Sequence, residues 1–192
     1  MNFKDQGIFP VINTDRLVCR QITMADASLL HQYWSDLEVT KYLSLNPFKK
    51  MEETRDMIAI LNSLPGNKQG IRWAITRKMD NRVLGTCGFH NYKPEHFRAE
   101  VGYELGKEHW RQGIMTEALT AILAYGFRVM NCNRIEAFVN YGNAKSTRLL
   151  ERNGFKLDGI LREYEFNQGK FVNQYCYSLL KSDCPKLARP IV

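Results

Sequence analysis

The segment over residues 99–139 constrains the fold most, because its pattern predicts a strand, a loop, a helix and a second strand in one continuous stretch. Residues 99–105 alternate like a strand, residues 114–129 have the apolar spacing of a helix, and residues 135–139 read as a second strand. A crossover through a helix makes a βαβ unit, which places two parallel strands in one sheet. We therefore expect a sheet with a parallel pair inside it.

Hairpin and helix patterns surround this unit. Asp80-Asn81, between two alternating runs, is typical of a hairpin turn. The other expected elements are strands over residues 17–22, 71–76 and 82–89, helices from Thr23 to about residue 34, over 51–64 and over 143–152, and two closing strands around Gln168-Gly169. The predicted fold class is α/β (α+β mixed), with a mixed, mostly antiparallel twisted sheet and helices on both faces.

The length of 192 residues fits a single domain over residues 1–192. Its core is expected over about residues 14–181, and residues 182–192 should form a frayed C-terminal tail. Residues 1–6 lack the apolar core of a signal peptide, and no stretch approaches the roughly 20 apolar residues that span a bilayer. We expect a cytoplasmic protein that does not enter a membrane.

The cysteines and histidines argue against a disulfide framework and a metal site, and the net charge indicates which kinds of partner the chain would attract. The five cysteines form no C-x-x-C pair and the four histidines are scattered, so neither a disulfide framework nor a metal site is predicted. The formal charge of +7 would attract a phosphorylated cofactor, an acidic protein or RNA, and charge alone does not choose among them.

The run Trp110 to Glu117 lies where a strand leads into a helix. Free backbone N–H groups at the start of a helix converge on an anion, and a pyrophosphate suits that position. Gly113 permits close approach of the backbone, while Arg111 and Gln112 can add charge or hydrogen bonds. The alternative is that Gly113 is only a structural cap.

Residues 99–105, followed by residues 110–118, resemble the coenzyme A (CoA) motif of the GNAT superfamily, whose usual pattern is Q/R-x-x-G-x-G/A. Trp110 and Met115 depart from the first and last positions of that pattern, but both are familiar in the branch that acetylates the N-terminal alanine or serine of ribosomal proteins. Residues 143–155 match the N-x-x-S…L…GF motif of the same branch. The resemblance extends over about residues 14–181.

The resemblance implies acetyl-CoA as co-substrate, no metal, and direct transfer of acetyl to a primary amine. The acceptor would be the N-terminus of a protein or peptide, with ribosome association as one implication. Independently of the resemblance, apolar residues in the helical first third of the chain leave room for a homodimer. A small amine such as a polyamine or an antibiotic is the alternative acceptor, and a non-catalytic CoA-binding module is the alternative class. The cofactor-binding residues carried over are Tyr103, Glu104 and Leu105 through their main chain, Arg111, Gln112, Gly113, Ile114, Met115 and Thr116 around the pyrophosphate, and Asn143.

The same resemblance implies catalytic roles for three residues. Ser146 matches the position proposed to protonate the departing sulfur, and Glu165 aligns with a proposed base. Glu100, on the strand beside the thioester, is the alternative base, and both glutamates can instead be solvated strand residues. About a fifth to a third of an α-amine is already neutral near pH 7.3, against about a thousandth of a lysine side chain, which favours an N-terminal amine. Asn173 stands where the branch often has an aspartate.

Overall fold

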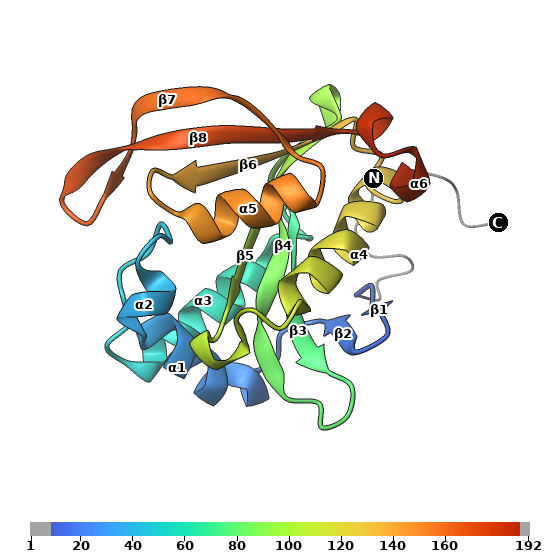
Figure 1. Cartoon of the computed structure of the whole chain (residues 1–192). Coiled ribbons are helices and arrows are strands. Elements are labelled where there is room, and N and C mark those ends of the chain that lie inside the picture. Colours follow the sequence, from blue (N-terminus) through green and yellow to red (C-terminus); the bar gives the residue numbers. More distant parts are fainter. Residues whose placement is uncertain (1–8, 189–192) are drawn as a thin grey trace.

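A twisted sheet of eight strands runs through the centre of the molecule (Figure 1). The computed structural model describes residues 9–188, so the segment 1–6 and the last part of the predicted tail lie outside the described residues. Across the sheet the strands follow the order β1-β2-β3-β4-β5-β6-β8-β7. Their bounds are Ile12–Asn13 (β1), Leu17–Arg20 (β2), Ile71–Arg77 (β3), Val83–Lys93 (β4), Arg98–Leu105 (β5), Arg134–Asn140 (β6), Lys156–Asn167 (β7) and Lys170–Leu180 (β8).

The pairing confirms the predicted mixed sheet. All neighbouring strands are antiparallel except β5 and β6, which are parallel and are joined through α4 (Ile114–Arg128). The predicted turns are also present: Asn81 between β3 and β4, and Gln168 and Gly169 between β7 and β8, have the positive φ angles that tight hairpin turns require. The predicted βαβ unit is therefore present, and it contains the only parallel pair of neighbours among the described strands.

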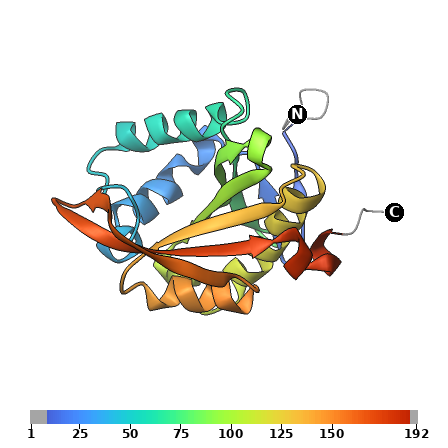
Figure 2. The same cartoon turned by 90° about the horizontal axis from the view of Figure 1, so that it is seen from above.

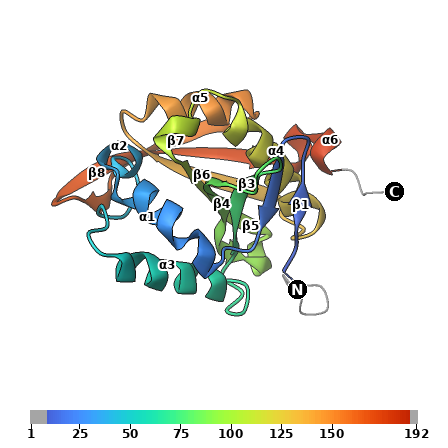
Figure 3. The same cartoon turned by 90° about the horizontal axis from the view of Figure 1, so that it is seen from below.

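Helices cover both faces of the sheet (Figures 2 and 3). One face carries α1 (Ala27–Ser35) and α3 (Met51–Ser63), and the other carries α4 and α5 (Ala144–Arg152). Each pair of helices encloses its own apolar core: Trp73 lies in the core under α4, whereas the next residue, Ala74, lies in the core under α1 and α3. Because successive side chains of β3 enter the two cores alternately, the strand is buried along most of its length.

Three features differ from the sequence-based expectation. The short strand β1 and the short helix α2 (Leu37–Thr40) were not predicted, because two and four residues are too few to show a period. The expectation of a frayed tail after Lys181 is wrong through residue 188. A 3₁₀ turn, Lys181–Asp183, and α6 (Pro185–Ala188) follow β8, and Leu187 packs against the core beside α4.

Candidate active site

The parallel strands β5 and β6 pair over a short stretch and then separate. Their register runs from Arg98 opposite Arg134 to Glu100 opposite Glu136, and no later pair is formed. Beyond this point β5 continues to Leu105 paired only with β4, and β6 continues paired only with β8. The facing edges of the two strands therefore present backbone N–H and C=O groups that lack a strand partner. An extended chain can add to such an edge through main-chain hydrogen bonds.

The β5–α4 loop, residues 106–113, leads from this split to the start of α4. Arg111 and Gly113 have φ angles of 60° and 74°, in the left-handed region, and Gly113 is the N-cap of α4. The N–H groups of Ile114, Met115 and Thr116 follow at once and have no acceptor within the helix. Left-handed residues next to free helical N–H groups form a concave, positively polarised site that suits an anion.

Side chains contribute unequally to this predicted phosphate site. Ile114 and Met115 are buried, so only their main chain is available, while Arg111 and Thr116 are exposed. The amide of Gln112 donates from Nε2 to the Glu108 carbonyl oxygen at 2.8 Å, which holds the loop together. Two side chains were predicted to add polar contacts to a bound phosphate. Arg111 is exposed beside this site, whereas the Gln112 amide is hydrogen-bonded within the loop.

Packing fixes the β5–α4 loop between α1 and α5. A Cβ atom at Gly106 would lie 2.3 Å from the Tyr33 ring, so the chain can leave β5 here only as glycine. Trp110 donates its indole N–H to the Leu105 carbonyl oxygen at 3.0 Å, and Lys145 Nζ lies 3.8 Å from the centroid of the Trp110 ring. The loop and the first turn of α5 are therefore held together at the open end of the split.

Two hydroxyl groups meet on the face of the sheet covered by α4 and α5. Tyr103 Oη and Ser146 Oγ lie 2.8 Å apart, which joins β5 to the first turn of α5. Burial raises the pKa of Tyr103 to about 12, against a smaller lowering by the Ser146 hydroxyl. Asn143 is the N-cap of α5, and its Oδ1 accepts from the Ser146 N–H at 3.3 Å. This cap fixes the backbone of Ser146.

The side chain of Tyr103 was missed by sequence reasoning, which assigned this residue only a main-chain role. Its alternation with Val101 and Leu105 was the available signal, since both of those residues belong to the core under α4. Alternation along one strand cannot predict the hydrogen-bond partner of Tyr103, because Ser146 follows 43 positions later in the sequence.

The opposite face of the same strands carries carboxylates. Glu100 and Glu136 are register partners, and each already has cationic or polar neighbours: Glu100 accepts from His90 Nε2 at 2.9 Å and from Asn91 Nδ2 at 2.8 Å. Burial raises the pKa of Glu100, but the hydrogen bonds and the charge of His90 outweigh that effect, and its pKa lies below the usual value. A carboxylate held in this way stays ionised and is a weak base.

The side chain of Glu104 is buried on this face, and interior residues occupy its carboxylate. Its carboxylate pairs with Arg72 and accepts from Thr86 Oγ1 at 2.5 Å and from Trp34 Nε1 at 3.2 Å. Only 8% of Glu104 is exposed. The structure thus gives its side chain a role in joining β3, β4 and α1 to β5, which leaves its main chain for the predicted contact with a cofactor.

Glu165 belongs to β7, and it lies on the same face, where the β7–β8 hairpin forms its end. Gln174 Nε2 donates to Glu165 Oε2 at 2.7 Å and to Asn140 Oδ1 at 2.8 Å. Asn140 in turn donates to the Tyr42 carbonyl oxygen at 3.3 Å, so the loop after α2 closes against β6. In the part of the chain that the structure describes, the Glu165 carboxylate forms no ion pair, in contrast to Glu100 and Glu104.

The predicted site residues therefore divide between two faces that meet at the split. Ser146, Tyr103 and the start of α4 lie on one side, and Glu100 and Glu165 lie on the other. The unpaired strand edges suit an extended pantetheine arm, and the start of α4 suits a pyrophosphate, so the residues present fit a CoA thioester. Within residues 9–188 no cluster of three or more metal-ligating side chains is present, and none of the helices there is long and apolar enough to cross a membrane.

Comparison with known proteins agrees with this geometry. The acetyltransferase (GNAT) domain family matches residues 16–156, and the chain belongs to this family. It is therefore an N-acetyltransferase. It is 44% identical over 170 residues, which are 88% of this chain and 96% of the relative, to the uncharacterized N-acetyltransferase p20 of Bacillus licheniformis.

Two further similarities concern ribosomal-protein acetyltransferases. The chain is 26% identical over 184 residues to the [ribosomal protein uS5]-alanine N-acetyltransferase of Escherichia coli, covering 90% of this chain and 91% of that protein. A solved structure of RimL, a ribosomal L7/L12 α-N-protein acetyltransferase in complex with coenzyme A, matches with a TM-score of 0.81 and 23% identity. The match covers 89% of this chain and 98% of that chain, and it shows that the fold is shared with a protein that binds CoA.

Proposed function

We propose that this chain transfers the acetyl group of acetyl-CoA to the α-amine at the N-terminus of a protein or peptide, with ribosomal proteins in the cytoplasm as the first candidates. The observation that carries the proposal is the split between β5 and β6. The cofactor would enter this split from the α4–α5 side, and the acceptor would approach from the other. Acetyl-CoA supplies the activated thioester.

The groups on the α4–α5 side serve the cofactor. The main chain of Tyr103, Glu104 and Leu105 offers hydrogen bonds along the open edge of β5, and the N–H groups at residues 111–116 receive the pyrophosphate. Ser146 Oγ donates a proton to the sulfur as the C–S bond breaks, and Tyr103 Oη, bonded to the same oxygen, stabilises the charge that develops there. The proton lost by Ser146 returns from solvent.

The groups on the other side serve the acceptor. The amine nitrogen forms the new bond to the acetyl carbon, and its surplus proton passes through water to Glu165, the carboxylate on this face that lacks an ion pair in the described chain. Glu100 serves this role less well, because its low pKa makes it a weak base. With one modest base available, an amine that is already partly neutral suits the site.

A competition between two amines in one peptide tests the acceptor. Peptides that start with Ala or Ser and contain one internal lysine would be incubated with acetyl-CoA, and products would be mapped by mass spectrometry. Ionisation alone favours the α-amine over lysine by roughly 200- to 350-fold at pH 7.3, and this ratio should fall toward about tenfold at pH 9.5. The control is the same peptide with a blocked N-terminus, which should be acetylated slowly at lysine.

Other acceptors are outcomes of the same assay. Exclusive reaction with lysine or with spermidine would reject the α-amine proposal and leave the acetyltransferase family assignment intact. Binding of acetyl-CoA without product from any peptide, ribosomal protein or polyamine would indicate a CoA-binding module instead.

A further inference from the structure

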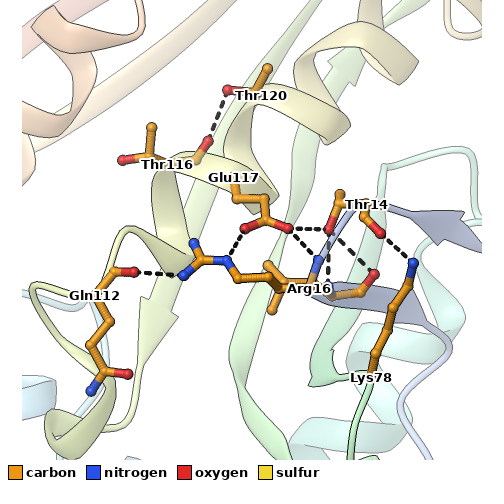
Figure 4. Close-up of polar contacts among 8 residues, drawn as sticks. Thr14, Arg16, Lys78, Gln112, Thr116, Glu117 and Thr120 are labelled. Carbon is orange, nitrogen blue, oxygen red and sulfur yellow. Dashed lines mark hydrogen bonds and ion pairs between the residues drawn. The ribbon is translucent and has the colours of Figure 1, made fainter.

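Arg16 lies against the β5–α4 loop, although it belongs to the turn between β1 and β2 (Figure 4). Its Nε donates to Glu117 Oε2 at 2.6 Å, and its Nη1 donates to the Gln112 carbonyl oxygen at 3.1 Å. Its backbone N–H also donates to Glu117 Oε1 at 2.8 Å. One side chain thus joins the loop just before Gly113 to the first turn of α4.

Arg16 also reaches the N-cap itself. Arg16 uses Nε to contact Glu117 and Nη1 to contact Gln112. A Cβ atom built on Gly113 would lie 3.3 Å from the third guanidinium nitrogen, Nη2. The guanidinium therefore occupies the space beside Gly113 that a side chain at this position would fill. A positive charge is placed directly at the loop that would receive a pyrophosphate.

Glu117 makes that positive charge necessary. It lies in the first turn of α4, within the region where a helix attracts anions, and an uncompensated carboxylate there would repel a pyrophosphate. Burial raises the pKa of Glu117, but hydrogen bonds from Thr14 and Arg16 and the charge of Arg16 outweigh it, so the group stays ionised. Thr14 Oγ1 donates to Glu117 Oε1 at 2.6 Å, which fixes the carboxylate (Figure 4).

We propose that Arg16 is a positioning residue of the phosphate site, which neutralises Glu117 and fixes the loop carbonyl at Gln112 so that the adjacent N–H groups face the cofactor. The inference rests on the proposed function, since it assumes that the start of α4 receives the pyrophosphate of acetyl-CoA. It adds a residue about a hundred positions before the loop to a site that the motif alone places within residues 110–118.

The test is a charge cycle at Arg16 and Glu117, read by calorimetry of acetyl-CoA binding. Arg16→Gln should weaken binding about tenfold at low ionic strength, and 0.5 M salt should reduce this deficit. Adding Glu117→Gln should restore most of the lost affinity, because the glutamine oxygen can still accept from Thr14 while the repelling charge is gone. Arg16→Lys, which keeps the charge and loses the two-point contact, should fall between wild type and Arg16→Gln.

Controls separate this inference from general damage and from the proposed function. Arg55→Gln removes an equally exposed arginine, 59% against 54% of the side chain, from an ion pair on α3 and should leave affinity unchanged. If Arg16→Gln binds like wild type, or if the double variant binds no better than Arg16→Gln, the charge-balancing role is rejected. If the wild-type protein does not bind acetyl-CoA, the proposed function itself fails.

Discussion

Removing the phenol oxygen of Tyr103 tests the hydroxyl pair at the split strands. Tyr103→Phe keeps the ring, and therefore the packing of β5 against the core, but deletes the 2.8 Å contact with Ser146 Oγ. If Ser146 protonates the departing sulfur, the phenol acts only through Ser146. The substitution should therefore slow the chemical step and leave the affinity for acetyl-CoA nearly unchanged.

The magnitude follows from the kind of hydrogen bond that is lost. A neutral hydrogen bond contributes about 0.5–1.5 kcal/mol, which corresponds to a decrease in kcat of about 2- to 13-fold. Ser146→Ala removes the proton donor itself and should lower kcat by about 10- to 1000-fold. Because the pKa of Tyr103 is raised to about 12, the phenol stays protonated, and its effect should be constant from pH 6.5 to 9.5. Steady-state rates across this range measure it.

The double variant decides whether the two hydroxyls act as a unit. In that case Tyr103→Phe should cost nothing further once Ser146 is alanine, since residues that act together are not additive. Equal losses in both backgrounds would refute the coupling, and a loss that grows above pH 8 would refute the assignment of a protonated phenol. Tyr177→Phe is the matched control, because its hydroxyl bonds to Glu151 on the same helix at 3.0 Å; it should change stability and not kcat.

Two further predictions concern the same site. Gly113→Glu should abolish acetyl-CoA binding in calorimetry, because residue 113 has a φ of 74° and a carboxylate there would repel the pyrophosphate; wild-type affinity would remove the phosphate assignment. Glu165→Gln should lower the rate near pH 7 and be partly rescued toward pH 9.5, since raising the pH delivers more acceptor amine already deprotonated. If Glu100→Gln shows this rescue and Glu165→Gln keeps full activity, the base is Glu100.

The sequence patterns predicted most of the elements because the long ones repeat their period several times. The helix in the βαβ unit, expected over residues 114–129, is Ile114–Arg128, and the helix expected over residues 51–64 is Met51–Ser63. The packed tail was not predictable in this way. Leu187 is a single apolar residue after a proline, and only its contact with the core beside α4 shows that the chain returns to the domain.

For the candidate site, the sequence motifs predicted which residues belong to it, and the fold shows which other residues these side chains contact. The left-handed Gly113 and the N-cap Asn143 follow from local chemistry, since each depends on neighbours within three positions. Contacts between residues far apart in the sequence do not follow from local chemistry. Arg16 meets Gln112 and Glu117 only because α4 lies over the strands β1 and β2 at one end of the sheet, and no periodicity in either segment carries that information.

Under the proposed function, in which the acceptor binds on the side of the sheet that carries Glu100 and Glu165, the charges of this face also bear on which amines would react. Glu100 and Glu104 each have a cationic or protonatable neighbour, so neither offers a free carboxylate to hold a fully charged acceptor. Glu165 has an amide partner and no ion pair in the described chain, and it is the carboxylate proposed as the base on this face. A polyamine arrives with several charges and lysine with one that it releases near pKa 10.4, so both would need more countercharge or a stronger base than this face provides. An α-amine, with a pKa near 7.7–8.0, needs neither.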